Sequence, residues 1–165
     1  MQNIKIRKLE QKDSPEVLEI VKNLRGWFDN YALTFEIPND LNFHQGHAAE
    51  WDGKIVGFVT YSSFEGEVFI SWLGVSPDYQ RKGIGEALVR ELEEKLIRLG
   101  INKLKVETLS EKIKYKPYIL TRNFYRKMGF VETTNRKIIS KETKEKLELV
   151  TFQKDLTEEI KIVEE

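Results

Sequence analysis

Apolar and polar residues alternate along several short segments of the chain, and the pattern changes to helical spacing in others. Ile4 and Ile6 alternate with polar neighbours, which predicts a short strand. Asp13-Ser14-Pro15 then supplies a helix cap with proline near the first turn, so a helix is expected next. Its apolar face consists of Val17, Leu18, Ile20, Val21 and Leu24.

Two tight reversals organise the region that follows. The sequence HAAEWDGKIVGFVTY places Asp52-Gly53 between two strand-like runs, a pattern typical of a hairpin. A second reversal at Glu65-Gly66 leads into VFISWLGV, which is apolar almost throughout and therefore predicts a central strand. Three antiparallel strands are expected here. Residues 27–43, which precede them, contain aromatics without clean periodicity and predict an irregular, partly helical segment that could form a wall or a lid.

The second half of the chain returns to alternating helices and strands. Leucine and isoleucine recur at helical spacing after residue 83, and Gly100 stands where such a helix would end. Residues 101–109 alternate like a strand, and because they follow a crossover helix they are expected to run parallel to VFISWLGV. A helix over 118–128, a strand from Gly129 and a last strand over 147–156 complete the pattern, with an exposed helix or loop expected in the lysine-rich stretch 136–146.

These elements predict an α/β fold with a mixed sheet, antiparallel first and locally parallel in the middle, flanked by helices. The length of 165 residues suits one domain, assigned to 1–156, followed by a charged C-terminal tail at 157–165. Lys plus Arg and Asp plus Glu number 27 each, so no global field points to nucleic acid or a membrane. The absence of cysteine excludes disulfides and thiolate metal sites, and with no signal-like or spanning apolar run it favours a cytoplasmic protein without a metal.

The segment QRKGIG carries the clearest candidate chemistry. Gln80, Arg81, Lys82, Gly83, Ile84 and Gly85 stand where a strand gives way to a helix. The first amides of a helix lack intrahelical acceptors and lie at the positive end of its dipole, so an anion gains several N–H bonds there. Glycine lets the backbone approach phosphate oxygens, and the two cations add full charges. The spacing matches neither a GxGxxG nor a Walker-type motif, and a pyrophosphate is the expected ligand.

The longer stretch WLGVSPDYQRKGIGEALVRELE resembles the central motif of the GNAT superfamily of acyl-CoA-dependent N-acyltransferases. That motif is an apolar strand, a proline turn, then Gln or Arg, two residues, Gly, any residue, and Gly or Ala. A second family feature, an aromatic pair in the penultimate helix followed by Gly-Phe, is matched by NFYRKMGF at 123–130. The order of strands and helices agrees from residue 3 to about 156, so the resemblance covers nearly the whole chain.

The resemblance implies a GNAT-like fold in which the central strand splays from its parallel neighbour at a bulge. The pantetheine arm of acetyl-CoA would pair with the backbone exposed there, at Leu73, Gly74 and Val75. Gly74 fits this expectation, because a glycine inside such a strand often marks a bulge or the close approach of another backbone. The amide of Val75 would stabilise the oxyanion, and 80–85 would bind the pyrophosphate.

The resemblance also implies that Tyr125 protonates the departing thiolate. Phe124, one position away, is expected to pack in the core. The family often has an asparagine seven positions before the tyrosine, where this chain has Tyr118. At the strand positions where some members keep a Glu or His base, this chain has Ser71 and Phe69. The base is therefore open: Ser71 could hold a water, or it is one of Glu67, Asp29, Glu36, His44 and His47.

Acceptor recognition is expected to fall to the segment before the hairpin, where Trp27, Phe28, Tyr31 and Phe35 could line a pocket, and to the loop 111–118. Three functions remain open. The first is an N-acetyltransferase that uses acetyl-CoA and an unidentified amine in a ternary complex, since no cysteine can carry the acyl group. The second is a non-catalytic acyl-CoA sensor, and the third is a phosphate or nucleotide binder unrelated to acyl transfer. A homodimer is an analogy with the family.

Overall fold

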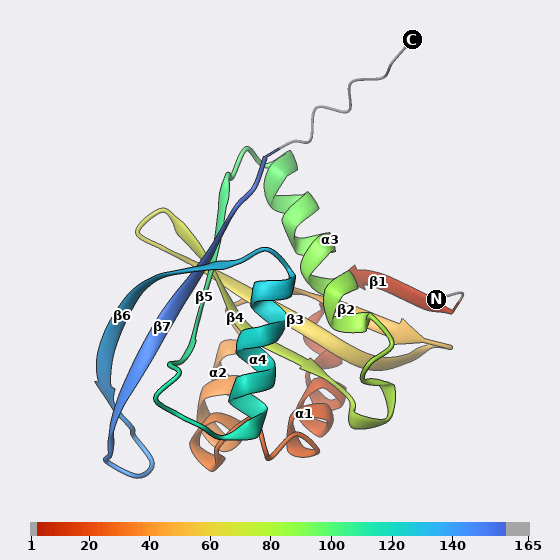
Figure 1. Cartoon of the computed structure of the whole chain (residues 1–165). Coiled ribbons are helices and arrows are strands. Elements are labelled where there is room, and N and C mark those ends of the chain that lie inside the picture. The colour runs from red at the N-terminus through yellow and green to blue at the C-terminus, as the bar shows by residue number, and fades with distance from the viewer. Residues whose placement is uncertain (1–2, 158–165) are drawn as a thin grey trace.

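Seven strands form one mixed sheet in the computed structural model, which describes residues 3–157 (Figure 1). The predicted charged tail lies outside the described residues from position 158 onward. In spatial order the strands are β1 (Ile4–Lys8), β2 (Gln45–Trp51), β3 (Lys54–Phe64), β4 (Glu67–Val75), β5 (Lys103–Leu109), β7 (Lys146–Asp155) and β6 (Val131–Ile139). All neighbours are antiparallel except β4 and β5, which are parallel, as the sequence predicts.

Helices cover both faces of this sheet and create two apolar clusters. The helices α3 (Ile84–Arg98) and α4 (Lys116–Lys127) pack on one face, where Leu88 and Leu92 are fully buried. On the other face α1 (Ser14–Lys22) and the short α2 (Ile37–Asp40) enclose a second cluster around Phe58. Among the helices of residues 3–157, none has the length and apolar character needed to cross a membrane.

The parallel strands β4 and β5 pair with each other over only a short part of their length. Their register pairs Phe69 with Lys105 and Ile70 with Val106, although β4 continues to Val75 and β5 to Leu109. The two strands therefore diverge beyond Ile70, and on that side the last part of β4 pairs with no other strand of residues 3–157. This is the splayed arrangement that the sequence resemblance implies.

The bulge in β4 lies at Ser71 and not at the predicted position around Gly74. Thr60 of β3 opposes Trp72 and the next residue, Tyr61, opposes Ile70, so Ser71 is the extra residue. The insertion shifts the alternation, which places Ile70 and Leu73 against the same core cluster. Glycine is required at position 74 for a different reason, since a Cβ there would lie only 2.9 Å from Cε1 of Phe58.

One further local prediction needs correction. The lysine-rich stretch 136–146 is neither helix nor simple loop, because residues up to Ile139 extend strand β6 and β7 begins at Lys146. β6 is an edge strand whose side chains are mostly exposed, so lysine stays hydrated while the backbone pairs with β7. Residues 27–43 are partly helical, as expected, since a π-helical turn, Ala32–Glu36, runs directly into α2.

Candidate active site

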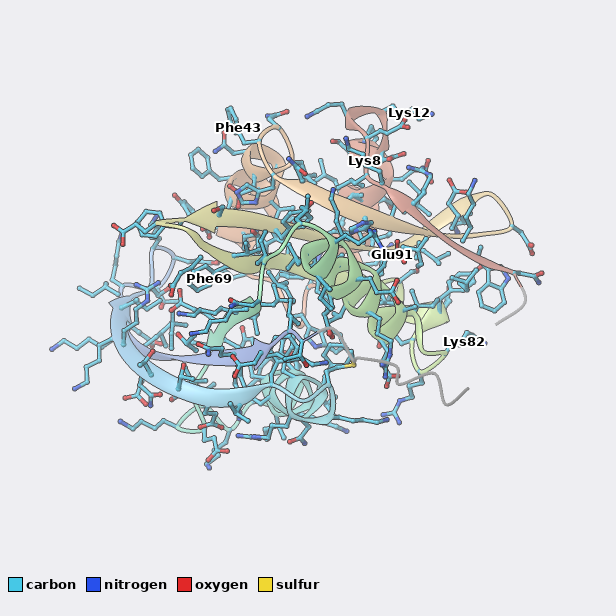
Figure 2. All side chains as sticks on the ribbon, turned by 90° about the horizontal axis from the view of Figure 1, so that it is seen from above. Lys8, Lys12, Phe43, Phe69, Lys82 and Glu91 are labelled. Atoms are coloured by element: carbon cyan, nitrogen blue, oxygen red, sulfur yellow. The ribbon has the colours of Figure 1, made fainter. Side chains whose placement is uncertain are left out.

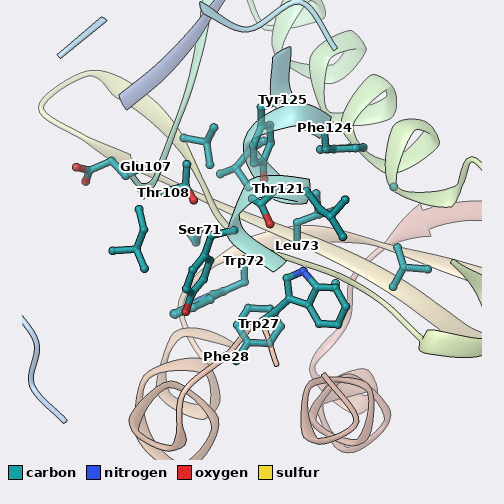
Figure 3. A pocket seen from close by; sticks show the side chains of 18 of the residues that line it. Trp27, Phe28, Ser71, Trp72, Leu73, Glu107, Thr108, Thr121, Phe124 and Tyr125 are labelled. Carbon is teal, nitrogen blue, oxygen red and sulfur yellow. The ribbon is translucent and has the colours of Figure 1, made fainter. Parts of the chain in front are cut away.

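A cavity of about 680 Å³ fills the space where β4 and β5 diverge (Figure 3). One wall is the end of β4, and the opposite wall is α4 with Thr121, Phe124 and Tyr125. The start of α3 closes one end, whereas residues of the segment 27–36 lie at the other (Figure 3). The cavity therefore joins a helix N-terminus to the exposed edge of a strand.

Most of the residues predicted to bind the cosubstrate line this cavity. They are Leu73, Gly74, Val75, Gln80, Arg81, Gly83, Ile84, Gly85 and Tyr125. Ser71, predicted to hold a catalytic water, lines the cavity as well. Lys82 is the exception, because its Nζ sits 5.7 Å from the ring centroid of Trp51 and its side chain points outward at the edge of the molecule (Figure 2). The sequence therefore predicted most of these lining residues correctly, but of the two cations it assigned to the site, only Arg81 lines the cavity.

The loop that leads into α3 has a backbone shaped for close approach of a ligand. Arg81 and Gly83 both have positive φ angles, 61° and 80°, and Gly83 is the residue that precedes the helix. The Gln80 side chain donates from Nε2 to the carbonyl oxygen of Val75 at 3.1 Å, which ties the loop back to the end of β4. The first amides of α3 thus face the same cavity as the end of the strand.

The amide of Val75 is directed into the gap. The next amide, that of Ser76, donates to the carbonyl oxygen of Val56 in β3 at 2.7 Å. Successive amides of an extended chain point to opposite sides, so the Val75 N–H points away from β3 and toward the side that β5 has left. A free backbone donor in such a cavity can stabilise a developing oxyanion.

Tyr125 is the buried acid candidate of α4. Its ring is 4% exposed and packs against Phe124, with centroids 5.2 Å apart, and against Phe130 at 5.4 Å. Burial raises the pKa of its phenol well above the ordinary value, so the hydroxyl stays protonated. That hydroxyl makes no hydrogen bond to any other residue of the described chain, and Figure 3 shows it directed toward the cavity.

Phe124 packs against the core cluster, as expected, but it also has a second role. It is partly buried and lines the cavity beside Gly85, where a Cβ would lie 3.5 Å from its Cε2 and Cζ atoms. Thr121 also lines the cavity one helical turn before Tyr125 (Figure 3). The spacing of four residues is a signal by which the sequence could have identified Thr121.

The structure separates the five side-chain candidates for the base. Asp29 and Glu36 line the cavity, and burial raises the pKa of Glu36. Glu67 instead pairs with Lys105, with Oε1 and Nζ 2.7 Å apart, at the far end of β4. His44 lines a second, smaller cavity, and His47 is buried outside both.

The end of the cavity beside residues 27–36, called the acceptor end because acceptor recognition was expected there, has aromatic walls that the sequence predicts in part. Trp27 and Phe28 line the cavity, and Phe28 meets Trp72 edge-on with centroids 5.8 Å apart (Figure 3). Tyr31 and Phe35 do not line it, because they pack against each other at 5.3 Å. Of the loop 111–118, Tyr118 alone among the described residues reaches the cavity.

The sequence did not point to several of the lining residues, most of which lie outside the motifs described above. They are Glu86, Val106, Glu107, Thr108, Leu109, Ile138, Leu147 and Leu149, together with Ala32, Tyr79 and Leu120. Glu107 is neutralised by Arg136 through two contacts of 2.7 and 2.9 Å. Residues 3–157 contain no group of three or more His, Cys, Asp or Glu side chains arranged to hold a metal ion.

Comparison with known proteins agrees with this geometry. The model of the Acetyltransferase (GNAT) family matches residues 5–130. The chain belongs to the GNAT acetyltransferase family. This membership makes it an acetyltransferase in the general sense, and it makes acetyl-CoA the implied acetyl donor.

Relatives and solved structures extend the match. An acetyltransferase of Yersinia pestis (strain Pestoides F) is 36% identical over 111 residues, which is 62% of this chain and 74% of the relative. The fold resembles the ribosomal-protein-S18-alanine N-acetyltransferase of Escherichia coli, with a TM-score of 0.73, 22% identity, and coverage of 93% of this chain and 94% of the other. It also resembles yncA of Salmonella typhimurium, described with its cofactor acetyl-CoA, with a TM-score of 0.67, 21% identity and 96% coverage of both chains. At these identities the structural matches show the fold alone.

Proposed function

We propose that this protein is an N-acetyltransferase that moves an acetyl group from acetyl-CoA to a primary amine by direct attack in a ternary complex. The observation that carries the proposal is the single cavity in which the start of α3, the unpaired edge of β4 and Tyr125 meet. Phosphates at the helix start, a pantetheine arm along the strand and a thioester near Tyr125 suit this arrangement. The sequence contains no cysteine that could carry the acetyl group between two half-reactions.

In the proposed reaction the neutral amine attacks the thioester carbonyl, and a C–N bond forms while the C–S bond breaks. The Val75 amide stabilises the oxyanion of the tetrahedral intermediate, a contribution of about 100- to 1,000-fold per donor in other enzymes. Tyr125 donates its proton to the leaving sulfur, and its raised pKa keeps it protonated for this step. The nitrogen loses one proton to solvent as the amide forms, and Tyr125 regains a proton from solvent, so the net change is one proton moved from nitrogen to sulfur. The only covalent change is acyl transfer, so no oxidant or reductant is required.

The proton of the acceptor ammonium must leave before attack. Ser71 lines the cavity at the bulge, and its Oγ lies 3.2 Å from the Oγ of Ser62 on β3. We assign to Ser71 the role of holding a water that accepts this proton. A hydroxyl has no charge of its own to offer, so the water must pass the proton on to bulk solvent.

Calorimetry with acetyl-CoA, CoA, ATP and NAD, followed by thiol release with a panel of amines and peptides, tests this function. Tight binding of acetyl-CoA with amine-dependent thiol release is expected. Binding without release across the panel would favour the acyl-CoA sensor, for which the replacement of the usual asparagine by Tyr118 is a specific argument. Absence of binding would overturn both.

A further inference from the structure

Two carboxylates at the acceptor end of the cavity have no cationic partner among the described residues. Asp29 and Glu36 both line the cavity, yet neither takes part in an ion pair within residues 3–157. Oδ1 of Asp29 accepts a hydrogen bond from the Ala32 amide at 2.7 Å, whereas its Oδ2 accepts none from residues 3–157. Asp29 is exposed and Glu36 is partly buried, so the cost of holding a charge without a partner falls mainly on Glu36.

The other charged residues that line the cavity are balanced or lie elsewhere. Glu107 is held by Arg136 through two contacts, and Glu86 lies 3.5 Å from Lys127. Arg81 belongs to the loop before α3, at the opposite end. The surplus at the acceptor end is therefore negative and comes from Asp29 and Glu36.

One lysine approaches these carboxylates without pairing with them. Lys141, in the loop between β6 and β7, acts on Glu36 through its charge, but its Nζ lies 5.6 Å from the ring centroid of Tyr31. Asp29 and Asp40 act on Glu36 in the opposite sense and add to the effect of burial, so the pKa of Glu36 is raised overall. Lys141 therefore reduces the negative potential at this end but does not cancel it.

Aromatic side chains also line the acceptor end and suit the apolar part of a cationic ligand. Trp27, Phe28 and Trp72 line it, and the Trp72 indole N–H is already donated to Asp40 at 2.8 Å. Their rings can contact a methylene chain and attract a cation through the π face. A hydrocarbon spacer that ends in a positive charge fits this combination better than a carboxylate or a neutral tail.

The cation held there cannot be the reacting amine itself. A carboxylate beside an ammonium favours the charged form and raises its pKa, whereas attack requires the neutral amine. The reacting nitrogen belongs at the unpaired edge of β4 beside Ser71 and Tyr125. Resting on the proposed function, we infer that the acceptor is a diamine or polyamine-like molecule whose second cation is held by Glu36 and Asp29.

Acceptors of equal length that differ only in the charge of the tail test this inference. The spacers would have about three to six methylenes, a length that suits a cavity of typical ligand size. For each spacer we would compare the diamine, the alkylamine with an uncharged tail, and the amino acid, whose tail ends in a carboxylate. We expect kcat/KM to fall in that order, with the diamine about 10-fold or more above the alkylamine, the factor that corresponds to about 1.4 kcal/mol. Glu36→Gln should remove most of this difference through KM.

Three further variants sharpen the experiment. Asp29→Asn keeps an oxygen for the Ala32 amide and should also lower the preference for diamines. Glu36→Lys should reverse the order so that the amino acid becomes preferred over the diamine. Glu94→Gln removes the same charge from an exposed position of α3 outside the cavity, and it should leave the order unchanged.

The outcomes separate this inference from the proposed function. Equal kcat/KM for all three tails, with no effect of Glu36→Gln, would overturn the second-cation site while the transferase remained. An equal loss of kcat for every acceptor in Glu36→Gln would also overturn it, since that would make Glu36 the base. If acetyl-CoA binds but no amine is acetylated, the proposed function is overturned, and the second-cation site is overturned with it.

Discussion

The indole Nε1 of Trp72 donates a hydrogen bond to Oδ2 of Asp40, 2.8 Å away. Trp72 follows the bulge of β4, and Asp40 is the last residue of α2. This bond therefore fastens the helical segment at the acceptor end to the strand that carries the unpaired edge. Asp40→Ala should destabilise the fold by about 1–3 kcal/mol, the cost of leaving such a donor unpaired.

The same variant should affect the two substrates unequally. We expect KM for the amine to rise in Asp40→Ala, whereas the Kd of acetyl-CoA should stay close to that of the parent because the α3 end is untouched. Asp40→Asn, which keeps an acceptor oxygen, should recover most of both losses. Denaturant unfolding and calorimetry measure these quantities, and an equal loss of affinity for acetyl-CoA would contradict the assignment.

Tyr125→Phe should slow turnover and spare binding. The variant keeps the ring that packs between Phe124 and Phe130 but removes the proton donor. A loss of about 100-fold in kcat is expected, the lower end for general acid catalysis, since a thiolate is a good leaving group. The Kd of acetyl-CoA should be unchanged. Tyr61→Phe, a tyrosine outside the cavity, is the matched control and should retain full activity.

The profile of activity against pH gives a second view of Tyr125. Burial raises the pKa of its phenol above the ordinary value of about 10, so the protonated form persists into alkaline solution. The rate should therefore show no loss from ionisation of Tyr125 up to at least pH ~10. A decline near neutrality that disappears in Tyr125→Phe would contradict this.

Gly85 should tolerate a methyl group but not a carboxylate. A Cβ at this position would lie 3.5 Å from Phe124, an ordinary contact, so Gly85→Ala should fold normally. Gly85→Glu would extend a negative group into the cavity where phosphates are proposed to lie, and the Kd of acetyl-CoA should rise roughly 100-fold or more. Ala87→Glu adds the same charge to α3 outside the cavity and is the control. A comparable loss of affinity for acetyl-CoA in that variant would contradict a phosphate site at Gly85.

His47 should make the fold sensitive to acid. The side chain is buried, its Nδ1 has no partner within residues 3–157, and burial with the nearby charges of Lys95 and Arg98 lowers the pKa of His47 to about 4. The unfolded chain binds this proton at about pH 6.5 and the folded chain does not, so stability falls as pH drops from about 6.5 to about 4.

Denaturant midpoints measured across that window, with His47→Leu as the comparison, test this expectation. The variant should show a flatter dependence on pH over the same range. Asp13, whose pKa is lowered chiefly by its hydrogen bond with Arg7, loses its contribution only at lower pH, as it becomes protonated. An unchanged slope in His47→Leu would show that His47 is not the group responsible.

The order and type of the elements were predictable because local patterns determine them. Asp52-Gly53 and Glu65-Gly66 form the expected tight turns, and all four of these residues have positive φ angles. The apolar face of α3 is equally local, since residues three and four apart share one side of a helix. The loop 80–85, proposed to bind the cosubstrate, could be placed beside the cavity for the same reason, as its residues are contiguous.

The acceptor end was not predictable in the same way. The segment around Glu36 lines it, and the other walls of the cavity include Glu107 on β5 and Leu147 on β7, which are far from it in the sequence. Which of these side chains meet depends on the packing of α2 and on the twist of the β6–β7 hairpin. The sequence alone therefore left five candidate bases where the structure leaves two carboxylates in the cavity.

The sequence by itself determined the element order, the parallel pair and the helix start with its glycines, because each follows from periodicity or from a contiguous motif. Only the tertiary structure decided that the bulge lies at Ser71, that Lys82 turns outward, and that Asp29 and Glu36 share a cavity with Tyr125. The physical reason is that strand register, side-chain direction and the neutralisation of charges depend on partners distant in the chain. Such partners are fixed only when the two faces of the sheet are packed.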